Sequence, residues 1–412
     1  MIVGTGQAGF QTAVSLREHG YAGSITLVGD EPHLPYQRPP LSKSYLIDGS
    51  AVDALSLRRK PFYESNGLQL RVGDPAIAVN RAERRLILKS GAKLDYDQLV
   101  LALGARPRSL PIFTANLRGV LTLRTIADAD ELRRELVAPK NILIVGGGFI
   151  GMEIAAAAAS TGHRVTVIET MHRVMARVVT PEISDYVSKM HASRGTSILT
   201  DRSAVVLYGV DGRVSSVELD DGMVLPADVV LVGIGVKPHT SLAEDAGLPV
   251  DNGVIVDEEL VTIDPRISAI GDCANFPSVH ARGRARLESV QNAVDQGKHV
   301  AARLAGRARR RYAAVPWFWT HQYDMVIQTA GIGHADDKRV VHGDPKSGHF
   351  SVLQFRNDAL TCVESVNSAV EHMAARRLLA GDLVGPEVTQ VLQPGFSLKQ
   401  FAKDARAATV AG

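Results

Sequence analysis

After Met1 the chain reads Ile2-Val3-Gly4-Thr5-Gly6-Gln7-Ala8-Gly9, and a similar stretch returns as Ile144-Val145-Gly146-Gly147-Gly148-Phe149-Ile150-Gly151. Each stretch ends a short β-branched run and opens a segment with the composition of a helix. A second run of strand character follows, at residues 24–28 in the first copy and 164–168 in the second. The repeat predicts two βαβ units, and therefore an α/β fold built on parallel strands.

The spacing of the glycines is typical of a dinucleotide-binding turn. The first glycine makes the tight turn, the second lets a pyrophosphate approach the backbone, and the third lets helix and strand pack closely. The helix N-terminus then offers free N–H groups to the phosphates. An acid follows about 20 residues after each turn, Asp30 in one copy and Glu169 in the other, where it can bind ribose hydroxyls. The alternative, glycines that only punctuate turns, is weaker for two matching copies than for one.

Two such turns imply two dinucleotides. A flavin and a nicotinamide form the economical pair, because hydride can pass directly between them. A carboxylate at Glu169 favours a free 2′-hydroxyl and repels a 2′-phosphate, which favours NADH over NADPH. Arg173 is close in the sequence and could soften that preference.

Repeated closing signals mark the ends of both units. Largely apolar runs at 97–104 and 228–235 end in glycine, as expected of buried parallel strands. Between the second fingerprint and its closing run, Asp211-Gly212 and Asp221-Gly222 predict the turns of an antiparallel meander.

After about residue 315 the pattern changes to alternating strands and a helix near 370–379, which predicts an α+β domain. We expect a discontinuous FAD-binding domain at 1–108 and 236–314, an NAD-binding domain at 109–235 and a C-terminal domain at 315–412. The fold class is therefore two Rossmann-like dinucleotide-binding domains plus a C-terminal α+β domain.

Composition excludes several classes of protein. A net charge of +2 over 412 residues, without a long basic insertion, argues against nucleic-acid binding. The two cysteines, Cys273 and Cys362, lie far apart and form no zinc or disulfide pattern, so we expect no metal and a reducing compartment such as the cytoplasm. No apolar run has the length of a membrane span, and no signal-peptide pattern is present. Because the first strand is short, we expect a few residues to precede Met1.

The cysteine count also bears on chemistry. Dithiol reductases need a redox-active cysteine pair beside the flavin, and this chain has none. In the stretch 41–46, Lys43 stands where a flavin-facing cysteine would otherwise be expected. Electrons are therefore expected to leave the flavin directly.

A third signal is Ser268-Ala269-Ile270-Gly271-Asp272-Cys273-Ala274. Asp272 can bind a ribityl hydroxyl of the flavin, or it can act as a helix cap, and both roles can hold together.

Together these motifs resemble the FAD-dependent ferredoxin reductases that serve oxygenases and cytochromes P450. The most specific pieces of the resemblance, which covers almost the whole chain, are the stretch Gly29-Asp30-Glu31-Pro32-His33-Leu34-Pro35-Tyr36-Gln37-Arg38-Pro39-Pro40-Leu41-Ser42-Lys43, the motif at 270–274, Glu288-Ser289-Val290-Gln291-Asn292-Ala293 and Pro316-Trp317-Phe318-Trp319. The resemblance implies a fold like that of glutathione reductase, with FAD and NADH as redox groups. It also implies an acidic [2Fe–2S] ferredoxin as electron acceptor, feeding a cytochrome P450 or an oxygenase.

The fingerprints and the resemblance together assign the binding residues. For FAD these are Gly4, Gly6, Gln7, Ala8, Gly9, Asp30, Arg38, Lys43, Ala76, Ala102, Gly104, Arg124, Gly271, Asp272, Ser289, Val290 and Trp319. For NAD they are Gly146, Gly147, Gly148, Phe149, Ile150, Gly151, Glu153, Glu169 and Gly235.

Three of these residues, Lys43, Glu153 and Trp319, are expected to take part in catalysis. A cation at Lys43 would stabilise an anionic reduced flavin; the alternative is a solvated surface lysine. Glu153, expected in the first turn of its helix, could pair with Lys43 or only favour the helix dipole. Trp319 is expected nearer the flavin than Trp317, although in a strand both would share one face. His321 is expected to be structural.

Docking of the acidic partner is assigned to Arg58, Lys298 and Lys399, with Arg284, Arg286 and the stretch 307–311 as further options. Each of these is singly a solvated charge, so only a cluster in space would count. Two alternative functions stay open. The first is a reductase of the same fold for rubredoxin, a quinone or monodehydroascorbate. The second is a binding flavoprotein like apoptosis-inducing factor.

Overall fold

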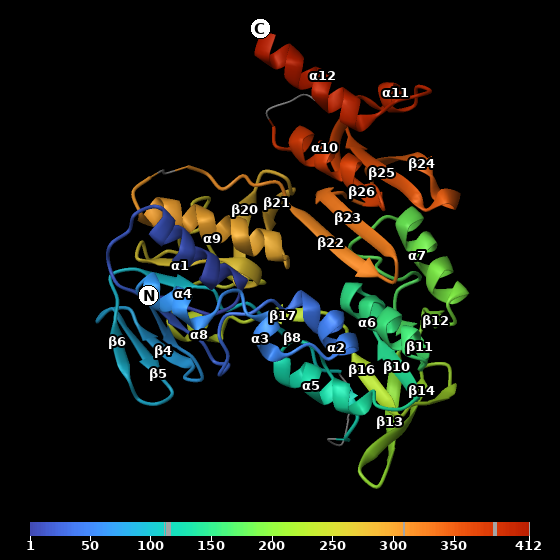
Figure 1. The fold of residues 1–412 in the computed structure, drawn as a ribbon, viewed down its shortest axis with the longest axis horizontal. Coiled ribbons are helices and arrows are strands. Elements are labelled where there is room, and N and C mark those ends of the chain that lie inside the picture. Colours follow the sequence, from blue (N-terminus) through green and yellow to red (C-terminus); the bar gives the residue numbers. More distant parts are fainter. Residues whose placement is uncertain (111, 113–116, 308–309, 382–384, 412) are drawn as a thin grey trace. The chain divides into compact units, whose positions relative to one another are not determined.

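The computed structural model describes residues 1–110, 112, 117–307, 310–381 and 385–411, which form two compact units (Figure 1). The first unit comprises Met1–Gln37, Val52–Arg106 and Lys237–Phe318. The second comprises Arg38–Ala51, Pro107–Val236 and Trp319–Gly412. The division into three domains stays a prediction.

A five-stranded parallel sheet forms the centre of the first unit. Its strands run in the order β19 (Ile267–Ala269), β7 (Leu99–Leu101), β1 (Ile2–Val3), β2 (Ile25–Val28), β3 (Leu68–Arg71). Helix α1 (Gln7–Glu18) packs on α9 (Val290–Leu304). The short first strand therefore lies in the middle of the sheet, where the turn that follows it is flanked by two neighbouring strands.

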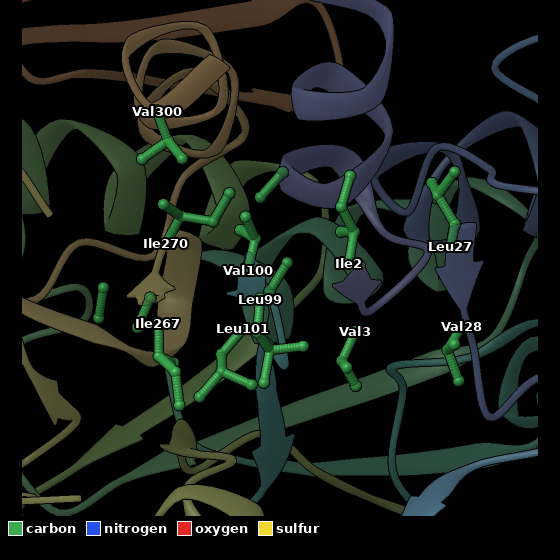
Figure 2. Packing of buried hydrophobic residues seen from close by; sticks show 14 of the residues in the cluster. Ile2, Val3, Leu27, Val28, Leu99, Val100, Leu101, Ile267, Ile270 and Val300 are labelled. Atoms are coloured by element: carbon green, nitrogen blue, oxygen red, sulfur yellow. The ribbon is translucent and has the colours of Figure 1, made fainter. Parts of the chain in front are cut away.

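The core of this unit explains its apolar strands. Figure 2 shows Ile2 and Val3 on opposite faces of the sheet, with Val300 of α9 on the helix side. Ile2 and Leu27 are 1% and 0% exposed. Strands covered on both faces cannot alternate with polar residues, which is why the sequence shows continuous apolar runs.

The second unit repeats this arrangement. Its parallel sheet has the order β12 (Ser197–Thr200), β11 (Arg164–Glu169), β10 (Asn141–Val145), β16 (Val229–Val232), β9 (Val120–Leu121). In both sheets the fingerprint strand lies between the strand that leads to the acid and the closing strand. The two βαβ units predicted from the repeat are confirmed.

The predicted meander is also confirmed, as β13 (Ala204–Val210), β14 (Arg213–Leu219) and β15 (Val224–Pro226). Asp211 and Gly212 have φ of 50° and 72°, as a two-residue turn with both central residues left-handed requires.

The C-terminal part is an antiparallel sheet with helices, as predicted. Its order is β22 (Trp317–Gln322), β23 (Met325–Gly331), β26 (Ala359–Val366), β25 (His349–Arg356), β24 (Lys338–Asp344). Helix α10 (Ala369–Leu379) covers β23 and β26, and α12 (Leu398–Ala411) packs on α10.

Helix α7 (Pro181–Ser193), which precedes β12, is attached to this sheet near both its ends. Thr180, its N-cap, donates to Glu364 of β26, and His191 in its last turn bonds Gln322 of β22.

Shorter elements complete the two units. In the first they are α3 (Val52–Leu55), α4 (Lys60–Ser65), β4 (Ala76–Asn80), β5 (Arg85–Leu88), β6 (Lys93–Asp95), α8 (Ser241–Asp245), β18 (Val254–Ile255), η2 (Gly271–Cys273), β20 (Ala274–Ser278) and β21 (Gly283–Ala285). In the second they are η1 (Pro39–Ser42), α2 (Ser44–Asp48), α5 (Ile126–Glu135), α6 (Phe149–Ser160), η3 (Pro345–Ser347) and α11 (Val388–Val391). The short strands β8 (Ala105–Pro107) and β17 (Val236–Pro238) pair with each other. Across the described ranges, no helix combines the length and apolarity needed to cross a membrane.

Candidate functional site

The first fingerprint forms a turn whose outer two glycines are dictated by the backbone. A Cβ on Gly4, at φ +114°, would lie 2.0 Å from the carbonyl oxygen of Ala102, and one on Gly9 would lie 2.0 Å from that of Gly4. Gly6 is different, because a Cβ there would meet nothing within 4 Å. Gly6 is also the N-cap of α1 and supplies no side chain to the helix. The turn thus leaves open space before a helix N-terminus, which fits the pyrophosphate of a dinucleotide.

Asp30 follows β2 and is exposed, with Oδ1 accepting the Glu31 N–H at 3.1 Å. The neighbouring Gly29 carbonyl accepts the Asp74 N–H at 3.2 Å, which brings the stretch before Ala76 alongside. Asp30 and Ala76, assigned to the same cofactor from the sequence, are therefore brought together at one edge of the unit.

The Gly271-Asp272 motif lies beside α1. A Cβ on Gly271 would be 3.2 Å from that of Ala8, and the Gly271 N–H donates to Gln296 Oε1 of α9 at 2.7 Å. The N-cap of η2 is Ile270, so the helix-cap alternative for Asp272 is wrong: the aspartate is the second residue of the short helix and does not precede it.

Further assigned residues lie in the same unit. Ser289 caps α9 by accepting the Asn292 N–H at 3.0 Å, and Val290 begins that helix. Gly104, at φ +68°, follows β7. Of the residues assigned to FAD, the first unit therefore holds Gly4, Gly6, Gln7, Ala8, Gly9, Asp30, Ala76, Ala102, Gly104, Gly271, Asp272, Ser289 and Val290, and the second holds Arg38, Lys43, Arg124 and Trp319.

Within the second unit, the segment with Lys43 is anchored on α5. Arg38 Nη1 donates to the Arg124 carbonyl at 2.6 Å. The Tyr45 hydroxyl donates to Asp130 at 2.6 Å, and Arg133 lies over the Tyr45 ring. Arg38 and Arg124 are thus brought into contact, and the loop that presents Lys43 is held at both ends.

The second fingerprint has the same geometry as the first. A Cβ on Gly146 would lie 2.5 Å from the Gly233 carbonyl oxygen, and one on Gly151 would lie 2.1 Å from that of Gly146. A Cβ on Gly148, the N-cap of α6, would meet nothing within 4 Å. Phe149 and the exposed Ile150 then open the helix. This turn also fits a dinucleotide.

Glu169 lies at the end of β11, beside this turn. Its Oε2 accepts the Gly147 N–H at 2.8 Å and its Oε1 accepts the Met171 N–H at 2.9 Å. The carboxylate is therefore fixed against the loop that would hold the pyrophosphate.

Arg173 does not pair with Glu169. Its Nη1 and Nη2 donate to the carbonyls of Val179 and Ala176, each at 2.8 Å. Burial lowers the pKa of Arg173, and the acids that act on it are Glu364 and Glu182. The guanidinium of Arg173 is therefore bound to backbone carbonyls rather than to Glu169, and its effect on the NADH preference stays a prediction.

Lys43 and Glu153 form the expected ion pair. Lys43 Nζ lies 2.8 Å from Glu153 Oε1, and the Glu153 side chain is 7% exposed. The alternative role of Glu153, an interaction with the helix dipole from the first turn of α6, is wrong. The helix begins at Phe149, so Glu153 lies beyond its first turn. The solvated-lysine alternative for Lys43 is excluded by the same contact.

Two further donors to Glu153 are missed by sequence reasoning. Ser42 Oγ donates to Oε2 at 2.6 Å, and Thr320 Oγ1 donates to Oε1 at 2.6 Å. Ser42 stands beside a residue already singled out, but nothing in the sequence signals Thr320. One buried carboxylate therefore gathers donors from η1 and from β22.

The side chains of β22 alternate between buried and exposed positions at this site. Thr320 and Gln322 are buried at 1% exposure, whereas His321 between them is exposed. Trp319 and His321 share the other face of the strand. The pKa of His321 is lowered by desolvation of its ring and by the positive charge of Lys43, which favours the neutral imidazole.

Both cysteines are buried and free. Burial raises the pKa of Cys273 to about 11 and raises that of Cys362 well above its ordinary value. Both thiols are protonated at neutral pH, so neither serves as a thiolate relay. The described residues also contain no cluster of His, Cys, Asp and Glu that could hold a metal ion.

The three docking candidates Arg58, Lys298 and Lys399 are exposed. Among the further options, Arg284 donates to the carbonyl of Val256, and Arg286 is 9% exposed and pairs with Glu288 at 2.6 Å. These two are occupied within the fold. Residues 308–309 of the basic stretch lie outside the described residues.

Comparison with known proteins agrees with this geometry. Residues 1–297 match the family described as pyridine nucleotide-disulphide oxidoreductase, and residues 317–402 match the family described as reductase C-terminal. Rhodocoxin reductase of Rhodococcus erythropolis is 46% identical over 97% of this chain and 93% of its own length.

Two solved structures are similar over nearly the whole chain. A ferredoxin reductase for the CYP199A2 system from Rhodopseudomonas palustris is 44% identical with a TM-score of 0.94, covering 97% of this chain and 98% of that one. The covalent putidaredoxin reductase–putidaredoxin complex gives a TM-score of 0.94 at 38% identity, covering 98% of each chain. The predicted fold class and the resemblance are confirmed, and the chain belongs to the pyridine nucleotide-disulphide oxidoreductase family and, within it, to the ferredoxin reductases.

Proposed function

We propose that this protein is an NADH-dependent, FAD-containing reductase that passes electrons to a small acidic [2Fe–2S] ferredoxin, and through it to a cytochrome P450 or an oxygenase. The observation that carries the proposal is the pair of dinucleotide turns, each with its acid, in a chain whose two cysteines are both buried. Two dinucleotides without a thiol relay leave direct transfer from the flavin to an external acceptor. The relatives named above are reductases of rhodocoxin, putidaredoxin and a ferredoxin.

The residues fit both dinucleotides. The turn from Gly4 to Gly9, with Asp30, would hold FAD, and the turn from Gly146 to Gly151, with Glu169, would hold NADH. FAD bound there would supply hydride acceptance from NADH and one-electron release to a carrier. The protein contributes mainly orientation, since hydride transfer needs no protein acid or base.

Single side chains have narrower tasks. Glu169 selects the ribose of NADH, because its fixed carboxylate disfavours a 2′-phosphate. Lys43 supplies positive charge that favours an anionic reduced flavin, and Glu153 holds that lysine in place. Trp319 is assigned to the same site by the resemblance.

The acceptor is expected to dock by charge. Arg58, Lys298 and Lys399 are exposed cations of the sign that an acidic ferredoxin requires. The two unpaired, protonated thiols are consistent with a reducing compartment, and we propose the cytoplasm.

The direct test is NADH-driven reduction of cytochrome c with and without an added acidic [2Fe–2S] ferredoxin. Rapid reduction that requires the ferredoxin is the expected result. Bleaching of the flavin by NADH without any effect of ferredoxin would overturn the acceptor, leaving rubredoxin, a quinone or monodehydroascorbate as alternatives. Failure of the purified protein to bind FAD would overturn the reductase function itself.

A further inference from the structure

We propose that Thr320, with Gln322 and His191 behind it, is a positioning residue for the Lys43–Glu153 pair. These residues form a buried chain of hydrogen bonds that ends on the Glu153 carboxylate. The inference rests on the proposed function for its catalytic consequence, but its geometry lies wholly within the second unit.

Thr320 and Lys43 bind the same oxygen of Glu153. Thr320 Oγ1 donates to Glu153 Oε1 at 2.6 Å, and Lys43 Nζ binds the same atom at 2.8 Å. Ser42 occupies the other oxygen, Oε2. The hydroxyl of Thr320 therefore restrains the oxygen on which the ammonium group of Lys43 rests.

The hydrogen bonds behind Thr320 all run in one direction, toward Glu153. Gln322 Nε2 donates to Thr320 Oγ1 at 3.4 Å, so the threonine hydroxyl accepts from Gln322 and spends its one proton on Glu153. Gln322 Oε1 lies 2.9 Å from His191 Nε2. Because an amide oxygen only accepts, His191 must carry its proton on Nε2.

The three residues behind Glu153 are buried. His191 is 0% exposed and Gln322 and Thr320 are each 1% exposed. Burial lowers the pKa of His191 to about 4, so its imidazole is neutral at working pH. Its other nitrogen, Nδ1, has no hydrogen-bond partner among the residues that the structure describes. Every donor in the chain thus points toward Glu153, and neighbouring hydrogen bonds of one direction strengthen one another.

The chain also joins separate parts of the sequence. His191 lies on α7, Gln322 and Thr320 on β22, Glu153 on α6 and Lys43 beside η1. Trp319 precedes Thr320 on β22 and lies on the opposite face. Fixing Thr320 therefore fixes the strand that carries Trp319 as well as the oxygen that holds Lys43.

The first readout is flavin bleaching by NADH, followed in a stopped-flow instrument with purified holoenzyme. We expect Thr320→Val to lower the limiting rate about tenfold, as small misplacements in active sites do. The apparent Kd for NADH should change little, and Thr320→Ser should restore the rate. Thr329→Val, on the adjacent strand β23, is the matched control and should behave as the unchanged protein.

The second readout does not depend on catalysis. In thermal unfolding, the loss of Tm caused by Thr320→Val should be clearly smaller in a Lys43→Met background, because both side chains act on one oxygen. The loss caused by Thr329→Val should be the same in both backgrounds. If the holoenzyme does not respond to NADH, the proposed function fails, and this cycle still decides the positioning role.

Three results would overturn the inference: a Thr320→Val protein that bleaches like Thr329→Val, additive losses of Tm in the cycle, or a Thr320→Ser protein that stays slow. If Thr320→Val does not fold, Gln322→Met keeps the volume and removes the amide. That variant should slow bleaching in the same direction, and a normal rate would equally reject the proposal.

Discussion

Glu169 illustrates how much a single side chain can decide. Its carboxylate is fixed by the N–H groups of Gly147 and Met171, and the nearby Arg173 is bound to backbone carbonyls instead. The negative charge beside the expected ribose is therefore not paired with that arginine.

We predict that Glu169→Gln weakens the preference for NADH. The amide keeps an oxygen for a backbone N–H but removes the charge that repels a 2′-phosphate. The ratio of kcat/KM for NADH to that for NADPH should fall about tenfold, equivalent to about 1.4 kcal/mol. Steady-state kinetics with both coenzymes measure this ratio, and an unchanged ratio would show that Glu169 does not read the ribose.

Sequence reasoning reaches some of these residues and not others. Asp30 and Glu169 are found because they stand at fixed distances from local fingerprints. Thr320 lies 167 positions from Glu153, and only the pairing of distant elements brings the two together. The sequence leaves the Lys43–Glu153 pair and the helix-dipole role of Glu153 as equal alternatives, and the structure shows the pair.

Within each fingerprint, glycine is required for two different reasons, as the turn before α6 shows. Gly151 has no Cβ because the backbone of Gly146 occupies that place, whereas the space at Gly148 is open. Gly151 is needed for the turn and the helix to pack closely, and Gly148 is needed for the ligand to approach.

We predict different failures for the two alanine variants. Gly148→Ala should fold, retain FAD and raise the KM for NADH roughly tenfold or more, because the added methyl group stands where the pyrophosphate approaches. Gly151→Ala should lower the Tm, since the clash at 2.1 Å is with backbone that cannot move aside. The flavin absorbance, KM and Tm of both proteins check this, and identical behaviour would refute the distinction.

The attachment of α7 to the C-terminal sheet contains a carboxylate that is costly to ionise. Both oxygens of Glu364 accept from the Thr180 N–H, at 3.1 and 2.9 Å, and Gln354 donates to Oε1. Burial raises the pKa of Glu364 to about 7, against the lowering effect of the bonds from Thr180. In the folded protein this acid therefore holds its proton up to near-neutral pH.

We predict a loss of stability between about pH 4.5 and 7 that depends on Glu364. In this window the unfolded chain releases the proton while the folded chain keeps it, so the free energy of unfolding falls as pH rises, by about 3 kcal/mol in all. Glu364→Gln cannot titrate and should lack this loss, whereas Glu131→Gln on the surface should retain it. Unfolding midpoints at pH 5 and pH 8 measure the effect, and a pH-independent difference between Glu364→Gln and the unchanged protein would contradict it.

At the scale of the whole molecule, a net charge of +2 offers little long-range attraction for an acidic protein. Docking must then depend on local cations. Arg58, Lys298 and Lys399 remain predictions of the sequence, and the structure adds that each is exposed.

We predict that Arg58→Glu, Lys298→Glu and Lys399→Glu each raise the KM for an acidic [2Fe–2S] ferredoxin severalfold, with the largest effect at low salt. NADH-driven reduction of ferricyanide should be unchanged, because it needs no protein docking. Lys93→Glu, on β6, is the control. Cytochrome c assays across a range of ionic strength test each variant, and a variant with the KM of the control would remove its residue from the docking surface.

The overall architecture could be predicted further than the site. The repeat, the closing strands and the turn at Asp211-Gly212 are local signals, and they predict the two βαβ units and the meander that the structure contains. Strand β24, in which only Val340 is buried, and helix α12 escaped explicit prediction, although their partners β25 and α10 lie nearby in the sequence. The contacts of α7 with the C-terminal sheet could not be predicted either, because they join residues far apart in the sequence.

The convergence of Ser42, Lys43 and Thr320 on one carboxylate has a consequence for protein engineering. Chimeras that exchange the C-terminal part between reductases, with a junction before residue 317, would import a foreign residue at position 320 into a contact built for Glu153. Such hybrids should work best when the donor also carries a hydroxyl residue there, or when positions 43, 153 and 320 are transplanted as a set. The C-terminal part of this chain is therefore not exchangeable independently of positions 43 and 153.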